Sequence, residues 1–144
     1  MKGPQKKTIL VVEDEIPLQK AAAIRLHAHG FHTLTARSVA EAKKHIQSEH
    51  IDGLWIDHYL IGEEDGYDFS RYVRTNKKTA NLPIFLVTNT ANPSRIDRYL
   101  ALGHVYYYLK SNFSLETIID EVDRCLSDAD HFFSPSATPN NTLL

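Results

Sequence analysis

The chain has 144 residues and a formal net charge of −2, from 16 lysines and arginines against 18 aspartates and glutamates. That length corresponds to one ordinary domain with its own core, and the charge balance argues against the basic face of a nucleic-acid-binding domain. The single cysteine, Cys125, excludes an internal disulfide and is typical of a cytoplasmic protein, and no apolar run approaches the roughly 20 residues of a membrane span.

Five short apolar runs alternate with longer amphipathic segments along the chain. The predicted strands are residues 8–12, 31–36, 53–57, 82–88 and 105–110. Continuous apolar strands of this kind suit a parallel sheet that is covered by helices on both faces. The sequence therefore predicts a (βα)5, doubly wound α/β fold with right-handed connections.

Capping residues and an apolar stripe mark the predicted helices. The signals are Gly30 and Gly103 at two helix ends, Ser38 with Glu41 as a capping box, and Asn92 before Pro93 at a helix start. The last helix carries an apolar stripe at Leu115, Ile118, Ile119, Val122 and Leu126. We expect one domain over residues 7–128, a short extension at 1–6 and a flexible tail at 129–144, where no hydrophobic period continues.

Chemically active side chains follow four of the five predicted strands. They are Glu13 and Asp14 after the first strand, Asp57 at the end of the third, Thr88 at the end of the fourth and Lys110 at the end of the fifth. Sites in open parallel sheets form outside the carboxyl ends of the strands, so we expect these groups to converge. Neighbouring carboxylates repel one another, and a hard divalent cation with oxygen ligands, such as Mg²⁺, would offset that repulsion.

Such a site suits phosphoryl transfer to a carboxylate. That reaction depends on charge neutralisation and in-line positioning rather than on covalent chemistry by many groups. We expect Asp57 to be the nucleophile that forms an acyl phosphate, with Lys110 and the metal neutralising phosphoryl oxygens and Thr88 donating a hydrogen bond.

The whole set resembles the receiver domain of the two-component response regulator family, over residues 7 to about 127. The motifs are VVEDE, GLWID ending in Asp57, the pair Asp65-Gly66, FLVT ending in Thr88, and YYLK ending in Lys110. The intervals are 43 residues from Asp14 to Asp57, 31 to Thr88 and 22 to Lys110, within a residue of the family's spacing. The resemblance implies a flavodoxin-like sheet with strand order 2-1-3-4-5.

The resemblance also implies a role for each residue. Asp57 matches the phosphoacceptor, and Lys110 and Thr88 match the groups that assist it. The Mg²⁺ or Mn²⁺ site corresponds to Glu13, Asp14, Asp57 and the backbone carbonyl of Tyr59. Thr88 and Tyr107 match a switch pair, in which the aromatic residue turns inward when the domain is phosphorylated.

The family's partners give further expectations. A sensor histidine kinase or a histidine phosphotransfer protein would donate the phosphoryl group. A downstream protein would bind a surface of the fourth helix, fifth strand and fifth helix, with Arg95, Arg98 and Tyr99 as candidates. The expected protein is a switch rather than an enzyme, beyond its own phosphorylation and dephosphorylation. We expect a monomer or weak dimer with no direct contact to nucleic acid or membrane.

Three positions depart from the family pattern. Ile61 replaces a usual proline in a loop that is one residue longer, which Gly62 can absorb. Asn89 replaces a small residue after the switch threonine, and Ser111 replaces the proline after the lysine. These departures leave open an alternative, a docking module that works without phosphorylation.

Other interpretations have less support in the sequence. A flavodoxin-like FMN protein needs a Ser, Thr or Gly phosphate loop after the first strand, where EDEIP would repel phosphate. An aspartate-nucleophile phosphatase would carry a D-x-D motif there. The eight histidines show no metal-ligand spacing, so we expect surface or hydrogen-bonded roles, and we interpret His58 beside Asp57 as incidental.

Overall fold

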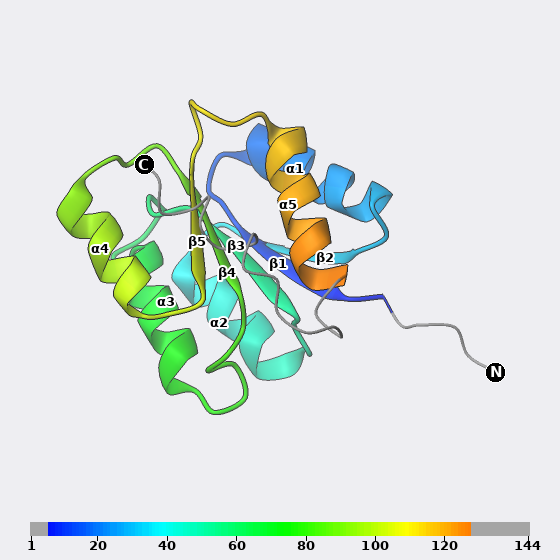
Figure 1. The fold of residues 1–144 in the computed structure, drawn as a ribbon. Helices are drawn as coiled ribbons and strands as arrows, with labels where there is room; N and C mark the ends of the chain where they lie inside the picture. Colours follow the sequence, from blue (N-terminus) through cyan, green and yellow to red (C-terminus); the bar gives the residue numbers. More distant parts are fainter. Residues whose placement is uncertain (1–5, 128–144) are drawn as a thin grey trace.

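The computed structural model describes residues 6–127 as one α/β domain (Figure 1). The predicted tail at 129–144 and residues 1–5 of the predicted extension lie outside the described residues. Strands and helices alternate as β1 (Thr8–Val12), α1 (Ile16–Ala28), β2 (His32–Ala36), α2 (Val39–Ser48), β3 (Gly53–Ile56), α3 (Gly66–Thr75), β4 (Ile84–Thr88), α4 (Pro93–Ala101), β5 (Val105–Leu109) and α5 (Leu115–Ser127).

The five strands form one parallel sheet in the order β2-β1-β3-β4-β5. Helices α1 and α5 cover one face of the sheet, and α2, α3 and α4 cover the other (Figure 1). The predicted (βα)5 architecture and its strand order are therefore confirmed.

Each face of the sheet packs into its own core, because successive strand residues point to opposite faces. On β3, Trp55 belongs to the core beneath α1 and α5, whereas Leu54 and Ile56 belong to the core beneath α2, α3 and α4. On β5, Tyr106 and Tyr108 take the first side and Tyr107 the second. Strands buried on both faces explain why the sequence reads as continuous apolar runs.

The predicted helix boundaries correspond to the observed caps. Gly30 and Gly103 follow α1 and α4 with φ of +96° and +82°, a region that favours glycine. The Asn92 side chain accepts a hydrogen bond from the Arg95 amide at 3.0 Å, and Pro93 is the first residue of α4.

The capping box predicted for α2 forms only in part. Ser38 Oγ accepts the Glu41 amide at 3.2 Å as expected. The Glu41 carboxylate, however, accepts the Arg37 amide at 3.0 Å, one residue before the cap. A complete capping box occurs instead at α3, where Asp65 and Asp68 accept each other's amides at 2.9 Å.

In the β3–α3 loop, Gly62 has φ of +99°, a conformation that favours glycine. The preceding residue, Ile61, forms an isolated parallel bridge with Ser38. No peptide bond among residues 6–127 is cis, so Ser111 follows Lys110 through a trans bond. Within the same range, none of the helices combines the length and apolar composition that crossing a membrane requires.

Candidate functional site at the carboxyl edge of the sheet

Strand register brings the functional groups to one edge. Val12 pairs with Ile56, and the next residue, Asp57, donates its amide to the Val12 carbonyl at 3.0 Å. On the other side, the Lys110 amide donates to the Thr88 carbonyl at 2.9 Å. The four strand-end groups predicted from the sequence therefore share one rim.

A lysine lies between two buried carboxylates at this rim. Glu13 is 0% exposed and Asp57 3%. Lys110 Nζ lies 3.0 Å from Glu13 Oε1 and 3.0 Å from Asp57 Oδ2. It also lies 3.5 Å from the exposed carboxylate of Glu15. One positive charge thus partly neutralises three carboxylates.

Burial and neighbouring charges shift the pKa values of Glu13 and Lys110. Burial, followed by the nearby charge of Asp57, raises the pKa of Glu13 to about 7. Burial alone would lower the pKa of Lys110, but Asp57 and Glu13 outweigh it, so the pKa of Lys110 is raised. The lysine therefore stays charged, and a further positive charge near the carboxylates would stabilise their ionised form.

The same acids have the chemistry of a divalent-cation site. Ligand oxygens of Glu13, Asp14 and Asp57 all lie within 4.8 Å of one another. Asp57 Oδ1 is buried and has no hydrogen-bond partner among the described residues. An unpartnered carboxylate oxygen beside two further carboxylates fits a hard cation such as Mg²⁺ or Mn²⁺.

Two polar side chains that the sequence analysis did not identify support this rim. Gln19 of α1 is buried, and its amide nitrogen donates to the carbonyls of Glu13 at 2.9 Å and Ala36 at 3.1 Å. Arg37 Nε donates to the Asp14 carbonyl at 3.1 Å. The sequence carries no clear signal for Gln19, because only the structure shows that this glutamine is buried, and buried amides are usually hydrogen-bonded.

The predicted switch residues meet at one loop residue. Thr88 is fully buried, and its Oγ1 accepts the Thr90 amide at 3.3 Å. Tyr107 is 1% exposed, and its hydroxyl donates to the Thr90 carbonyl at 2.5 Å. Tyr107 thus lies inward in this structure, and both side chains hold the β4–α4 loop at Thr90.

The candidate output residues on α4 differ in exposure. Arg98 is exposed, with its guanidinium 4.1 Å from the centre of the Tyr67 ring. Arg95 Nη1 lies 3.2 Å from Thr90 Oγ1 and 3.3 Å from the Tyr59 hydroxyl. The prediction that Tyr99 belongs to an exposed surface is wrong.

Tyr99 is 0% exposed because α4 turns it toward the sheet. Its ring meets that of Tyr67 edge to face at 5.4 Å, and its hydroxyl lies 2.6 Å from His58 Nδ1. His58 is 5% exposed, and burial lowers the pKa of its imidazole. The expectation of hydrogen-bonded histidines therefore holds for His58, although its partner was not foreseen.

Two of the three positions that the sequence predicted to depart from the family pattern lie next to these groups in the chain. Asn89 follows Thr88 and is exposed, and Ser111 follows Lys110 and is exposed. Tyr59, whose carbonyl was predicted to face the metal, is 50% exposed, and its ring meets that of His58 at 4.9 Å.

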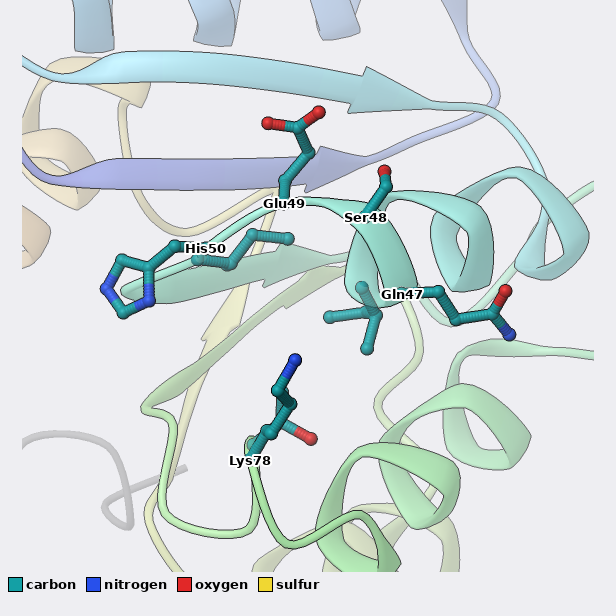
Figure 2. Close-up of a pocket in the computed structure, with 8 residues that line it drawn as sticks. Gln47, Ser48, Glu49, His50 and Lys78 are labelled. Carbon is teal, nitrogen blue, oxygen red and sulfur yellow. The ribbon is translucent and has the colours of Figure 1, made fainter.

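A pocket of about 310 Å³ lies at the opposite edge of the sheet (Figure 2). It is formed by the end of α2, the segment leading into β3 and Lys78 after α3. Because His50 and Ile51 precede β3 whereas Asp57 follows it, this pocket is separate from the carboxylate rim.

Comparisons with known proteins agree with this geometry. The family model of the response regulator receiver domain matches residues 9–123. The chain is 28% identical over 102 residues to the two-component response regulator ORR12 of Oryza sativa subsp. japonica, covering 71% of this chain and 84% of that protein. It is 24% identical over 123 residues to the polar-differentiation response regulator DivK of Brucella ovis, covering 85% and 98%.

Solved structures share the fold. The chemotaxis response regulator CheY4 of Vibrio cholerae superposes with a TM-score of 0.75 at 24% identity, covering 85% of this chain and all of that one. A CheY-like receiver domain protein of Methanospirillum hungatei gives 0.77 at 17% identity, covering 88% and 98%. With its parallel sheet, its acidic rim and a family match over most of its length, the chain belongs to the response regulator receiver domain family of two-component signalling.

Proposed function

We propose that this receiver domain is a phosphorylation switch whose phosphoacceptor is Asp57. The observation that carries the proposal is the pair of Asp57 oxygens. One, Oδ2, is held 3.0 Å from Lys110 Nζ, while Oδ1 is buried without a partner among the described residues. With one oxygen left for a cation and the other held by a lysine that can turn to the incoming phosphoryl oxygens, this carboxylate can bind the metal and also attack phosphorus.

The donor is a phosphohistidine of a histidine kinase or a histidine phosphotransfer protein, the class of partner with which receiver domains interact. A carboxylate oxygen of Asp57 forms the new P–O bond while the P–N bond to the donor imidazole breaks, and the imidazole nitrogen keeps the electron pair. Bound Mg²⁺ or Mn²⁺, held by Glu13, Asp14, Asp57 and the Tyr59 carbonyl, would neutralise phosphoryl oxygens.

The chain's own groups supply the remaining stabilisation. Lys110 stays protonated and attracts a phosphoryl oxygen. The Thr88 hydroxyl breaks its hydrogen bond with the Thr90 amide and donates to a second phosphoryl oxygen. This change frees the β4–α4 loop, which Tyr107 also holds. Movement of that loop changes the surface of α4, β5 and α5, where Arg95 and Arg98 are the proposed contacts for a downstream protein.

The test is Mg²⁺-dependent binding of beryllofluoride, a phosphoryl analogue, followed by backbone amide NMR shifts. The expected result is binding that requires both Mg²⁺ and Asp57, with shifts at Thr88 and Tyr107. Asp57→Asn should abolish it, and Asp97→Asn, at an exposed position on α4, should leave it unchanged. No response from folded protein at millimolar concentrations would reject the switch and favour a docking module that works without phosphorylation.

A further inference from the structure

A buried hydrogen bond joins the residue after Asp57 to helix α4. His58 Nδ1 and the Tyr99 hydroxyl are 2.6 Å apart, and the two residues are 5% and 0% exposed. A phenol hydroxyl can donate or accept, so this bond is compatible with either neutral tautomer of the imidazole. The proposed phosphoryl transfer assigns no role to either side chain.

The Tyr99 hydroxyl lies close to the backbone at the start of α3. A Cβ added to Gly66 would lie 2.8 Å from this hydroxyl and 2.9 Å from His58 Cα. The Gly66 amide donates to the His58 carbonyl at 2.9 Å. His58 is thus held through its backbone by α3 and through its side chain by α4.

We propose that Tyr99, acting through His58, positions the loop that carries Asp57 and the Tyr59 carbonyl, and so couples α4 to the phosphoacceptor site. The identity of what the loop binds rests on the proposed function, whereas the positioning is a property of the chain alone. His58 and Tyr99 are positioning residues, since neither is assigned a contact with the phosphoryl group.

The His58–Tyr99 hydrogen bond joins the loop after β3 to helix α4. Helix α4 also carries Arg95 and Arg98, so a shift of the loop at His58 is transmitted to residues that face outward. A second link between the same elements, from Arg95 to the Tyr59 hydroxyl at 3.3 Å, is longer and exposed. A buried hydrogen bond contributes more to position than a solvated one, because breaking it leaves polar atoms without water.

Coupling of this kind is reciprocal. If metal binding favours the His58–Tyr99 hydrogen bond by some factor, then formation of that bond raises metal affinity by the same factor, and a variant that lacks the bond loses that gain. The effect is visible without any phosphoryl group.

The experiment compares Tyr99→Phe with Tyr108→Phe. The first removes one oxygen and keeps the ring. The control removes the hydroxyl of another buried tyrosine, which donates a part-buried hydrogen bond to Glu121 at 3.2 Å on the opposite face of the sheet. Two quantities are measured on the full chain. The first is the rate of hydrogen exchange of the Gly66 amide without metal, and the second is the Mg²⁺ dissociation constant, obtained from backbone amide NMR shifts.

In Tyr99→Phe, we expect Gly66 exchange to become roughly three- to tenfold faster and the Mg²⁺ dissociation constant to rise by a similar factor, as the loss of one net hydrogen bond implies. Tyr108→Phe should change neither. His58→Phe should reproduce the effect on exchange, and combining it with Tyr99→Phe should add little, because the two act through one bond.

Wild-type exchange at Gly66 in Tyr99→Phe, or an equal change in Tyr108→Phe, would overturn the positioning role. If the wild-type chain binds no Mg²⁺, the proposed function fails, and the Gly66 exchange still decides whether Tyr99 positions the loop.

Discussion

Lys110 determines how two buried acids coexist at the carboxyl edge of the sheet. Its side chain is 13% exposed, and its Nζ lies 3.0 Å from a carboxylate oxygen of Glu13 and of Asp57. Removing one member of a buried ionic cluster leaves the others uncompensated, which generally costs more than the pair contributes. The lysine is therefore a structural counter-ion in metal-free protein as well as a candidate ligand for phosphoryl oxygens.

Replacing Lys110 by methionine, which keeps most of the stem, should lower the free energy of unfolding in metal-free buffer by about 2–4 kcal/mol. The cause is repulsion between Glu13 and Asp57 without their shared cation. Urea denaturation in the presence of EDTA measures it. Lys20→Met, at an exposed position on α1, is the control and should stay within about 0.5 kcal/mol of wild type. Equal stability of the two variants would mean that the acids are already neutralised by protons.

At the scale of single elements, the first residue of α3 packs tightly against the residue that follows Asp57. Gly66 is the first residue of α3, and a Cβ there would lie 2.8 Å from the Tyr99 hydroxyl and 2.9 Å from His58 Cα. A backbone atom cannot move aside as a side-chain tip can. The glycine of the Asp65-Gly66 motif is thus required by close approach rather than by its φ angle.

Gly66→Ala should therefore destabilise the fold by roughly 1–3 kcal/mol, the usual cost of overpacking. The matched variant is Gly53→Ala, whose Cβ would meet the flexible Leu126 Cδ1 at 3.2 Å, and it should cost less. Thermal unfolding of both variants makes the comparison. A larger loss in Gly53→Ala would contradict this account of the motif.

A histidine joins helices α1 and α5 on the other face. His29 Nδ1 lies 2.8 Å from Asp123 Oδ2, and this hydrogen bond raises the pKa of His29. Glu116 and Asp120 of α5 lie 4.0 and 3.9 Å from its Nε2. A raised histidine pKa stabilises the fold fully below the unfolded value of about 6.5, and this contribution is lost as pH rises through the folded pKa.

Asp123→Asn should consequently cost about 1 kcal/mol at pH 6 and less at pH 9. Asp120→Asn is the control, since its side chain is 66% exposed and farther from the imidazole. Urea midpoints at the two pH values test the difference. A loss in Asp123→Asn that is the same at both pH values would exclude the histidine charge as its source.

The sequence predicted most elements because strand periodicity, caps and strand-end chemistry agreed with one another. The prediction for Tyr99 was wrong because the arginines beside it, Arg95 and Arg98, are typical of an outward-facing helix surface. Ile96, Tyr99 and Leu100 have i, i+3, i+4 spacing, which was the available signal of a buried face. The bond from Tyr99 to His58 was beyond prediction, since it depends on how a helix and a loop 41 residues apart pack together.

At the scale of the whole molecule, the carboxyl edge of the sheet is a place where local electrostatics oppose the stability of the fold. The carboxyl edge concentrates Glu13, Asp14 and Asp57 against one lysine, an arrangement that favours a bound cation at the expense of the metal-free fold. Such local conflicts are expected at functional sites, because the rest of the core supplies the stability that tolerates them. A cation bound by these acids would stabilise the folded state by mass action.

This trade-off predicts that Mg²⁺ changes the difference in stability between wild type and Asp57→Asn. Without metal, Asp57→Asn should be about 1–2 kcal/mol more stable than wild type, because it removes a buried like charge from beside Glu13. With Mg²⁺, wild type should gain roughly 1.4 kcal/mol for each tenfold excess over its dissociation constant, while the variant, lacking one ligand, gains less. Unfolding curves over a Mg²⁺ series should therefore converge or cross. Parallel curves would mean that Asp57 is not a metal ligand, whereas a less stable Asp57→Asn without metal would mean that its bond to Lys110 outweighs the repulsion.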